Sequence, residues 1–398
     1  MLNKRSLRLF LLKWLSLIPA AKRDRFGSVP DTSNILLVRP DHIGDVLFTT
    51  PALRALRKAL PQANITYLVG EWSQEIVQNN PNVDRVITCQ FPYFSRLPRA
   101  SLLEPYTLLI KEARRIRRFG FDIAVNLRFD FWWGAMLSYF AGIPLRIGYD
   151  IAECRPFLSR FVPYVPQRHE VEQNISLIEH LIDRGHAPEP GYLDFLPGKE
   201  DEALAQAWLS QSPQGKRLAT ASRSTRVASG DLRRLVILHP GAGAPVKLWT
   251  SSNFAHIGDV LARKHNVQII LTGSASEFCL LKEIESMIEV PVRILSGANL
   301  GQLAALLHRC SLAIGVDTGI MHLAVAMGTP TVHLYGPVSD VSFGPWGERD
   351  KHIVVKSDMP CMPCNRLDYT IDELEAHPCV RAIPAEAVLA AAEKLLAR

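Results

Sequence analysis

Long apolar runs and a regular cysteine framework are both missing from this 398-residue sequence. No run approaches the roughly 20 apolar residues that a membrane-spanning helix needs. The seven cysteines are odd in number and spread along the chain, unlike those of a small secreted disulfide scaffold. These absences disfavour a membrane-spanning or secreted protein and favour the reducing cytoplasm.

Two common nucleotide-binding motifs are also missing. The Gly-rich segment 239–249, HPGAGAPVKLW, lacks the third glycine of a dinucleotide fingerprint and the Gly-Lys-Ser/Thr of a P-loop. A kinase or a nicotinamide-dependent enzyme is therefore disfavoured. Gly241 and its small neighbours still allow backbone N–H groups to approach a phosphate, with Lys247 as a point charge. The alternative for Lys247 is a solvated surface lysine.

Size and charge permit a two-domain protein with an anionic partner. The length suits two domains of ordinary size, and 47% hydrophobic with 21% charged residues is normal for a globular protein. The formal charge of +6 is modest. It permits a phosphorylated lipid head group or a nucleotide as partner and does not imply nucleic acid.

Apolar stretches alternate with stretches of helical periodicity along most of the chain. Strands are expected at 35–38, 65–69, 83–87, 122–127, 146–149, 235–238, 267–271, 312–316 and 331–334. Helices are expected from 45 and from 72, and at 108–119, 131–141, 169–185, 199–209, 251–264, 277–288, 300–308, 320–327 and 384–396. This alternation indicates an α/β fold with doubly wound parallel sheets.

A polar segment divides the chain into two Rossmann-like halves. Residues 210–231 are rich in Ser, Gly, Arg and Thr and bury too little apolar surface to offset their ordering entropy. We therefore expect a basic N-terminal helix in 1–30, a first domain in 31–209, a linker in 210–232 and a second domain in 233–398. A ligand cleft between the two domains is expected.

The N-terminal segment resembles a signal peptide at first sight, but Lys13 interrupts its apolar part. On a helical wheel Leu7, Phe10, Leu11, Trp14, Leu15 and Ile18 share one face, opposite Arg5, Arg8 and Ser16. Such an amphipathic helix with basic flanks lies on an anionic membrane surface or packs against its own domain. The sequence favours neither alternative.

The segment 35–56, ILLVRPDHIGDVLFTTPALRAL, holds the first candidate site. A buried strand leads through a loop to Asp45, at the start of a helix. Ligands of open α/β sheets bind beyond the carboxyl ends of the strands, so Asp45 is a candidate for chemistry. The alternative is that Asp45 only caps the helix.

Arginines near this crevice are candidates for an anionic acceptor. Arg128 follows a predicted strand and lies at the crevice edge. Arg114 and Arg118 belong to a basic run on a predicted helix, which either attracts the acceptor or is only a solvated face.

A second candidate site follows the strands of the second half. Asp317, Thr318 and Gly319 open a helix, whose free N–H groups and dipole suit a diphosphate. His322, one turn further on, reaches the same anion or is a packing residue. Glu277 accepts hydrogen bonds from ribose hydroxyls or is a first-turn Glu favoured by the helix dipole.

Together these motifs resemble glycosyltransferase family 9, the ADP-heptose:lipopolysaccharide heptosyltransferases. The resemblance covers roughly residues 34–396 and rests on motifs in the expected order: Arg39-x4-Gly44-Asp45-Val46-Leu47 with Pro51-Ala52-Leu53, His239-Pro240-Gly241-x5-Lys247-x-Trp249, Asp317-Thr318-Gly319-x2-His322-Leu323-Ala324-x-Ala326, and Gly336-Pro337. It implies a GT-B fold, in which the first half holds the acceptor and the second half the nucleotide sugar.

The resemblance also implies roles for single residues. Asp45 matches the family's proposed general base, Lys247 the lysine on the donor phosphate and Glu277 the acid on the ribose. The donor-binding turn matches Asp317, Thr318, Gly319 and His322, with Gly241 in the Gly-rich loop, and Arg39 joins Arg128, Arg114 and Arg118 as candidates for acceptor binding. The family is described as inverting and independent of a catalytic metal, and this sequence lacks a convincing Asp-x-Asp metal motif.

Three features depart from the family pattern. The polar segment 210–231 looks like an insertion, aromatic residues 131–133 lie beside the presumed acceptor crevice, and the basic N-terminal helix is additional. Cys361, Cys364 and Cys379 with His377 have a spacing that suits either a zinc site or loosely grouped thiols.

We expect an inverting, metal-independent transferase that needs no cofactor and moves a heptose or related sugar from an ADP-sugar to a lipopolysaccharide core-type acceptor. The expected location is cytoplasmic, peripheral on the inner membrane. The rivals are a GT-B enzyme with another nucleotide-sugar donor, an epimerase, and a non-catalytic glycolipid-binding scaffold.

Overall fold

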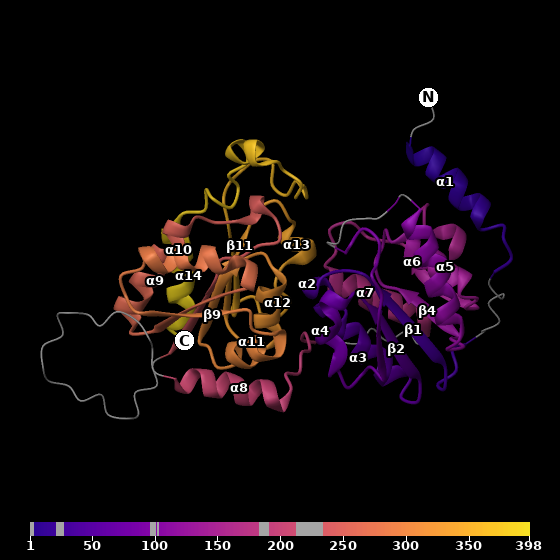
Figure 1. Cartoon of the computed structure of the whole chain (residues 1–398), viewed down its shortest axis with the longest axis horizontal. Helices are drawn as coiled ribbons and strands as arrows, with labels where there is room; N and C mark the ends of the chain where they lie inside the picture. The colour runs from indigo at the N-terminus through magenta and orange to yellow at the C-terminus, as the bar shows by residue number, and fades with distance from the viewer. Residues whose placement is uncertain (1–3, 21–27, 96–100, 102, 183–190, 212–233) are drawn as a thin grey trace, which may run out of the picture. The chain divides into compact units, whose positions relative to one another are not determined.

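The computed structural model describes residues 4–20, 28–95, 101, 103–182, 191–211 and 234–398. The chain forms two compact units, Met1–Asp194 and Phe195–Arg398. Figure 1 shows the first in indigo to magenta and the second in pink to yellow. Each unit contains a six-stranded sheet whose neighbouring strands run parallel.

The sheet of the first unit has the strand order β3-β2-β1-β4-β5-β6. Its strands are β1 (Asn34–Arg39), β2 (Asn64–Val69), β3 (Arg85–Thr88), β4 (Ile123–Asn126), β5 (Leu145–Tyr149) and β6 (Arg160–Val162). β1 lies between β2 and β4, where the apolar side chains of residues 35–38 are buried. This burial explains why the strand is a continuous apolar run.

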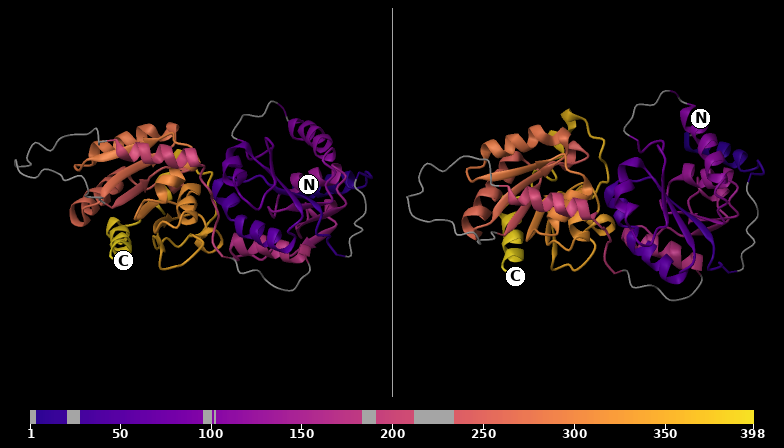
Figure 2. Two further views of the ribbon diagram at one scale, coloured as in Figure 1. Left: turned by 90° about the horizontal axis from the view of Figure 1, so that it is seen from below. Right: turned by 60° about the horizontal axis from the view of Figure 1, so that its bottom comes forward.

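Helices cover both faces of this sheet (Figure 2). They are α1 (Lys4–Leu15), α2 (Ile43–Leu47), α3 (Thr50–Ala59), α4 (Gln74–Gln78), α5 (Glu104–Arg117), α6 (Trp132–Phe140) and α7 (Glu170–Ile182), with the short η1 (Glu71–Ser73) and η2 (Arg155–Phe157). Helix α3 packs on α7, and α5 packs on α6. The core beneath α5 and α6 joins Leu36 and Val38 of β1 to Ile116 and Trp133.

The sheet of the second unit has the order β12-β11-β10-β7-β8-β9. Its strands are β7 (Leu235–His239), β8 (Gln268–Gly273), β9 (Val292–Ser296), β10 (Leu312–Val316), β11 (Thr331–Tyr335) and β12 (His352–Lys356). Numbered from its own first strand, this sheet has the order 3-2-1-4-5-6 of a Rossmann fold, as does the sheet of the first unit. Each sheet therefore has one switch point, between β1 and β4 or between β7 and β10.

The helices of the second unit are α8 (Lys199–Ser210), α9 (Ser251–His265), α10 (Phe278–Met287), α11 (Leu300–Leu307), α12 (Gly319–Ala326), α13 (Asp340–Phe343) and α14 (Ala385–Leu396), with η3 (Pro245–Lys247), η4 (Ala275–Glu277) and η5 (Ile371–Ala376). Thr250 caps α9 as its residue type predicts, because its side chain accepts a hydrogen bond from the Asn253 backbone N–H. The α9, α10 and α14 side of the sheet shares one apolar core.

The predicted strands are present, but the sequence did not reveal β6, β9 and β12. All three are edge strands and are only partly buried. An edge strand has a neighbour on one side only, so it needs fewer apolar residues than a central strand. Arg293 interrupts the apolar residues of β9, and β6 is short, so neither shows the continuous run by which central strands are recognised. β12 does contain an apolar run, 353–355, which sequence reasoning missed.

The division between the units lies earlier than the predicted boundary. Helix α8 was assigned to the first domain, but it packs on α11 and belongs to the second unit. The expected linker 210–232 lies, apart from Ser210 and Gln211, outside the described residues. Among the helices of the described residues, none is long and apolar enough to cross a membrane.

Candidate functional site

The first group of candidate residues lies at the switch point of the first sheet. Arg39 is the last residue of β1, Asp41 lies in the loop that follows, and the chain leaves β4 at Leu127 and Arg128. The loops after these two neighbouring strands diverge, because each strand connects to the opposite half of the sheet. The structure thus brings Arg39, Asp45 and Arg128 together at one edge.

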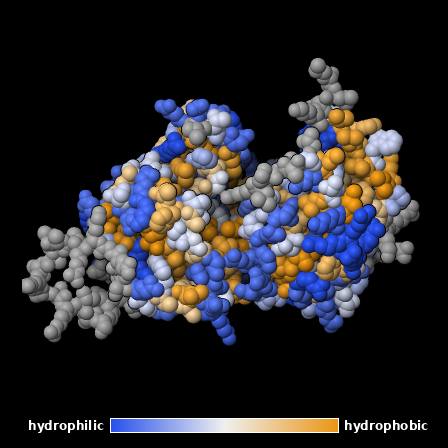
Figure 3. All heavy atoms as spheres, in the orientation of Figure 1, coloured by the Kyte–Doolittle hydropathy of each residue, from blue (hydrophilic) through white to orange (hydrophobic). Residues whose placement is uncertain are grey.

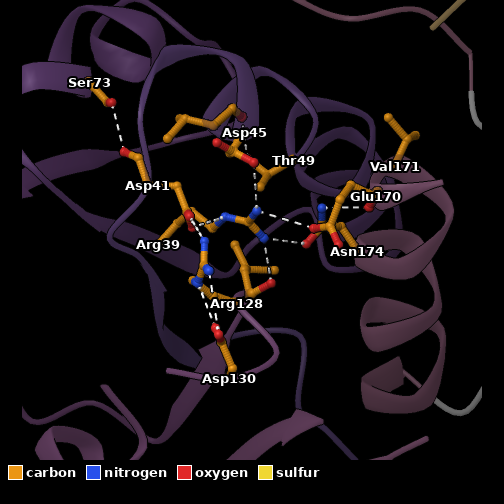
Figure 4. A network of polar contacts seen from close by, with 12 residues as sticks. Arg39, Asp41, Asp45, Thr49, Ser73, Arg128, Asp130, Glu170, Val171 and Asn174 are labelled. Atoms are coloured by element: carbon orange, nitrogen blue, oxygen red, sulfur yellow. Dashed lines mark hydrogen bonds and ion pairs between the residues drawn. The ribbon is translucent and has the colours of Figure 1, made fainter. Parts of the chain in front are cut away.

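Arg39 is the buried centre of this group (Figure 4). Its Nη2 lies 3.2 Å from the Glu170 carboxylate and 3.6 Å from Asp45, and its Nε lies 2.5 Å from Asp41. Its Nη1 donates to the Leu127 carbonyl at 2.6 Å. Burial acts to lower the pKa of Arg39, but the surrounding carboxylates outweigh burial and raise it above its ordinary value. Arg39 therefore holds its charge and ties α2 and α7 to the ends of β1 and β4.

Arg128 forms a second layer nearer to solvent. It pairs with the buried carboxylate of Asp41 and, through Nε at 2.7 Å, with exposed Asp130. Its guanidinium also lies over the rings of Phe94 and Phe129, 5.1 and 5.6 Å from their centroids. Unlike Arg39, it is partly exposed and remains accessible to an anionic ligand.

Asp45 is the most accessible carboxylate of the three around Arg39. Its side chain is 30% exposed, whereas those of Asp41 and Glu170 are almost fully buried. Burial, reinforced by the Asp41 carboxylate, raises the pKa of Asp45 to about 7, although Arg39 and Arg128 act to lower it. The capping alternative is wrong, because the N-cap of α2 is His42. A carboxyl group that titrates near neutrality at a sheet edge can accept a proton from a ligand.

Arg114 and Arg118 do not belong to this group. They lie on and just after the last turn of α5, where the chain returns to the start of β4. There the Asn34 side chain, at the start of β1, donates to the Phe119 carbonyl at 2.9 Å. Asp45 follows the opposite end of β1, so these two arginines lie at the other edge of the sheet. Both are exposed, which fits the solvated-face alternative.

Sequence reasoning missed Asp41 and Glu170. Asp41 lies among polar loop residues, and Glu170 looks like an ordinary first-turn acid of α7. Their roles depend on contacts with Arg39, and Glu170 is 131 residues away from it. One signal was present for Asp41, since it lies in the loop that leads to Asp45.

The second group lies at the switch point of the second sheet. The loop after β7 carries Lys247, and the turn after β10 carries Asp317. The ammonium group of Lys247 lies 2.5 Å from the Asp317 carboxylate and 3.2 Å from the Asp317 carbonyl. Burial acts to raise the pKa of Asp317, but His322 and Lys247 hold it well below its usual range. Lys247 is therefore an ion-paired residue of the site and not a solvated surface lysine.

The turn after β10 has the predicted helix-start geometry. Thr318 is the N-cap of α12, which begins at Gly319. Thr318 Oγ1 is buried and has no hydrogen-bond partner among the residues that the structure describes. His322 is buried, with Nε2 at 3.7 Å from the Asp317 carboxylate. The arrangement leaves a hydroxyl and the helix N-terminus for an anion, with His322 supporting the turn from within.

Glu277 lies against the Gly-rich loop and also caps a helix. Its carboxylate accepts from the backbone N–H and the hydroxyl of Ser274, both at 2.8 Å. A Cβ at Gly241 would lie 2.0 Å from Glu277 Oε1, so only glycine allows this approach. The neighbouring His239 is buried against Thr272, at 3.0 Å. The helix-start alternative for Glu277 is confirmed, and its contact with ribose stays a prediction.

The cysteine cluster does not form a metal site in this structure. Cys361 and Cys364 are exposed, Cys379 is buried, and the Cys364 sulfur lies 3.5 Å from the Tyr369 hydroxyl. Across the described ranges, no group of three or more His, Cys, Asp or Glu residues is placed to hold a metal ion. The loosely grouped thiols are the interpretation that this geometry favours.

Comparison with known proteins agrees with this geometry. The sequence model of glycosyltransferase family 9 (heptosyltransferase) matches residues 109–373. Lipopolysaccharide heptosyltransferase 3 of Escherichia coli K12 is 26% identical over 361 residues, which cover 89% of this chain and 95% of that protein. The crystal structure of a family 9 glycosyl transferase from Veillonella parvula superposes with a TM-score of 0.74 at 25% identity, covering 94% of this chain and 99% of that one. The structure of the E. coli ADP-heptose LPS heptosyltransferase II gives a TM-score of 0.69 at 23% identity, covering 92% and 98%.

Proposed function

The chain belongs to glycosyltransferase family 9 and has the GT-B fold, and from this premise we propose that it transfers a heptose from an ADP-sugar to a lipopolysaccharide core-type acceptor. The observation that carries the mechanism is Asp45, an accessible carboxylate at a switch point with its pKa raised to about 7. The names of the relatives support the choice of heptose and of the acceptor class.

Asp45 acts as the general base in this proposal. As an acceptor hydroxyl attacks the anomeric carbon of the donor, the Asp45 carboxylate takes the hydroxyl proton. The new glycosidic bond forms as the bond from the anomeric carbon to the diphosphate oxygen breaks, and the electron pair leaves with the nucleotide. A single displacement of this kind inverts the anomeric centre. This displacement uses one accessible carboxylate. Of the three carboxylates around Arg39, Asp45 is the accessible one.

Arg39 positions the base and does not itself contact the acceptor. The support for this assignment is its burial and its contacts with the carboxylates of Asp41, Asp45 and Glu170. Arg128, partly exposed and next to Phe94 and Phe129, is the better candidate for contact with the acceptor. The acceptor contacts expected of Arg114 and Arg118 are not part of this proposal.

The second unit holds the donor in this proposal. Lys247, Thr318 and the N–H groups at Gly319 stabilise the negative charge that develops on the leaving diphosphate. Glu277, beside Gly241, accepts hydrogen bonds from ribose hydroxyls. A lysine and a helix N-terminus supply the charge that a divalent cation provides in other transferases, so we propose that no catalytic metal is needed.

The test is a pair of carboxylate variants assayed with ADP-heptose and a heptose-deficient core acceptor. Asp45→Asn should lower kcat roughly 10²- to 10⁴-fold and leave the Kd for ADP unchanged, because the base lies in the acceptor unit. Asp150→Asn is the matched control, since Asp150 is 31% exposed and paired with Arg155 in the same unit. It should retain activity.

Three outcomes would contradict the proposal or one part of it. If Asp45→Asn turned over at the wild-type rate, another group would be the base. If neither the wild type nor the variants transferred heptose while a panel of other nucleotide sugars gave product, the donor assignment would be wrong. Transfer that stops in EDTA and returns with a divalent metal would contradict metal independence alone.

The acceptor class also suggests a location. A lipid-linked core sugar is reached from a membrane surface, and we propose that the chain acts peripherally at the cytoplasmic face of the inner membrane.

A further inference from the structure

Helix α1 carries an apolar face that the described part of the first unit leaves uncovered. Leu12 is buried in the core beneath α5 and α6, and Leu15 packs beside it. On the other side of the helix and just after it, the exposed large apolar residues are Leu7, Phe10, Leu11, Trp14, Leu17 and Ile18. Trp14 is 61% exposed and Leu17 is 70% exposed. Exposed apolar residues gathered in this way mark an interaction surface.

The folded unit holds this face outward. Arg5 Nε pairs with Glu153 at 2.9 Å, and the Tyr139 hydroxyl contacts the carbonyls of Ser16 and Ile18 at 2.9 and 2.6 Å. With Leu12 in the core, these contacts fix both ends and the middle of the helix. The outward face is therefore a feature of the folded unit. Figure 3 shows apolar side chains gathered over α1 at the upper right.

Charge identifies the partner as an anionic surface. At 3.6 residues per turn, Arg8 and Lys13 lie on the two opposite edges of the apolar stripe. Both are exposed, and residues 4–20 contain no acidic residue. An apolar stripe bordered on both sides by cations fits the boundary between the acyl chains and the head groups of a bilayer.

We propose that the outward face of α1 inserts into the surface of an anionic phospholipid bilayer, parallel to the membrane plane. Phe10, Leu11 and Trp14 enter the acyl boundary, while Arg8 and Lys13 contact lipid phosphates. Amphipathic helices of this composition bind by apolar burial together with electrostatic attraction.

The position of α1 connects this surface to the proposed acceptor site. Arg5 holds the helix start to Glu153, and the next residue, Cys154, contacts the Phe129 carbonyl through its sulfur at 3.5 Å. Phe129 lies next to Arg128, which belongs with Arg39 and Asp45 to the first group of candidate residues. The surface thus begins near the sheet edge where the proposed function places the lipid-linked acceptor. This connection rests on the proposed function, whereas the lipid contact itself does not.

The experiment is flotation of the full chain with vesicles of phosphatidylethanolamine and phosphatidylglycerol, compared with phosphatidylcholine vesicles. The wild type should bind the anionic vesicles, and its affinity for them should fall as the salt concentration rises. Phe10→Ser with Trp14→Ser should reduce the affinity roughly 10- to 100-fold. Arg8→Gln with Lys13→Gln should reduce it about fivefold per removed charge, and only for anionic vesicles. All four side chains are exposed, so the variants should fold.

The control is Met287→Ser with Val341→Ser, which removes two exposed apolar residues from the second unit. This variant should bind vesicles like the wild type. Brominated phosphatidylglycerol should quench Trp14, and the quenching should disappear in Trp14→Phe while vesicle binding persists.

Two results would overturn the lipid assignment. One is equal vesicle binding by the wild type and the α1 variants. The other is loss of a dimer in the Phe10 and Trp14 double variant without any effect on vesicle binding, which would identify a second copy as the partner. Transfer to a water-soluble core oligosaccharide should be unchanged in the α1 variants. If no variant and no wild type transferred sugar, the proposed function would fail while the vesicle result stood.

Discussion

The surroundings of Asp45 suit the proton transfer that the proposed function assigns to it. Its carboxyl group faces the Arg39 guanidinium, which also pairs with two buried carboxylates, Asp41 and Glu170. Burial and the Asp41 carboxylate outweigh the arginines and raise the pKa of Asp45 to about 7. A general base is most effective when its pKa lies near the working pH. The same environment means that ionised Asp45 lowers the stability of the folded protein.

Asp45→Asn should therefore stabilise the protein at pH 8. The pKa of Asp45 is raised from 3.8 to about 7 on folding, so the folded state binds this proton more tightly than the unfolded state. Stability from this group is present at low pH and is lost as pH rises from about 4 to 7. Because the side chain is partly exposed, we expect a gain of about 1–3 kcal/mol at pH 8, or several degrees in Tm.

Thermal unfolding of the wild type and Asp45→Asn at pH 5 and pH 8 measures this effect. The Tm difference should be larger at pH 8, and Asp150→Asn should show no such trend. An equal Tm difference at both pH values would mean that Asp45 titrates like an ordinary carboxyl group.

At the scale of elements, the proposed donor site depends on the close approach of two segments. The loop after β7 and the short helix η4 come together because Gly241 has no side chain where the Glu277 carboxylate lies. The same carboxylate caps η4 through Ser274. One side chain therefore links the start of a helix to the proposed ribose site.

Gly241→Ala should weaken nucleotide binding more than it weakens folding. The new Cβ would displace Glu277, which is the flexible end of a side chain, so we expect a stability loss of only about 1 kcal/mol from the lost cap. The Kd for ADP should rise about tenfold, which corresponds to the loss of about 1.4 kcal/mol in ribose contacts. Calorimetric titration with ADP measures the change.

Ser274→Ala separates the two roles of Glu277. It removes one capping hydrogen bond and leaves Gly241 and Glu277 in contact, so its Kd for ADP should stay close to that of the wild type. If Ser274→Ala and Gly241→Ala weakened ADP binding equally, the effect would come from the helix start alone.

Strands and helices could be predicted where a local sequence pattern determines them. Features that depend on contacts between distant residues could not. Central strands such as β1 and β10 are continuous apolar runs, and the turns that follow them place Asp45 and Asp317 at the sheet edges. An edge strand such as β9 lacks that pattern, because Arg293 interrupts its apolar residues. The environment of Asp45 could not be read from the sequence, since Glu170 reaches Arg39 across 131 residues.

At the scale of the whole molecule, buried titratable groups in the two units favour opposite responses of stability to pH. In the second unit, burial lowers the pKa of His239 and of His352 to about 4, and it lowers the pKa of His333 well below its ordinary value. These histidines stay neutral in the folded state. In the unfolded state they take up protons once the pH falls below about 6.5. The stability that they provide is complete above that pH and is lost as pH falls towards 4. Asp45, in the first unit, has the reverse effect over the same range.

Mild acid should therefore loosen the second unit first. Hydrogen exchange of the full chain at pH 5, corrected for intrinsic rates, should show a larger loss of protection in β11 and β12 than in β1 and β4. His352→Asn, which removes one titrating ring next to Thr331, should reduce the pH dependence of unfolding by up to one proton. An unchanged pH dependence in this variant would show that His352 is not responsible.

The repeated strand order has a consequence for how such enzymes diversify. The chain passes from the first sheet to the second near residue 194, and each sheet carries its own polar loops. Under the proposed function, recombination at that crossing would exchange the unit proposed to hold the acceptor and leave the unit proposed to hold the nucleotide intact. Chimeras joined there should inherit acceptor preference from one parent and donor preference from the other, which provides a route to new glycan linkages without redesign of either module.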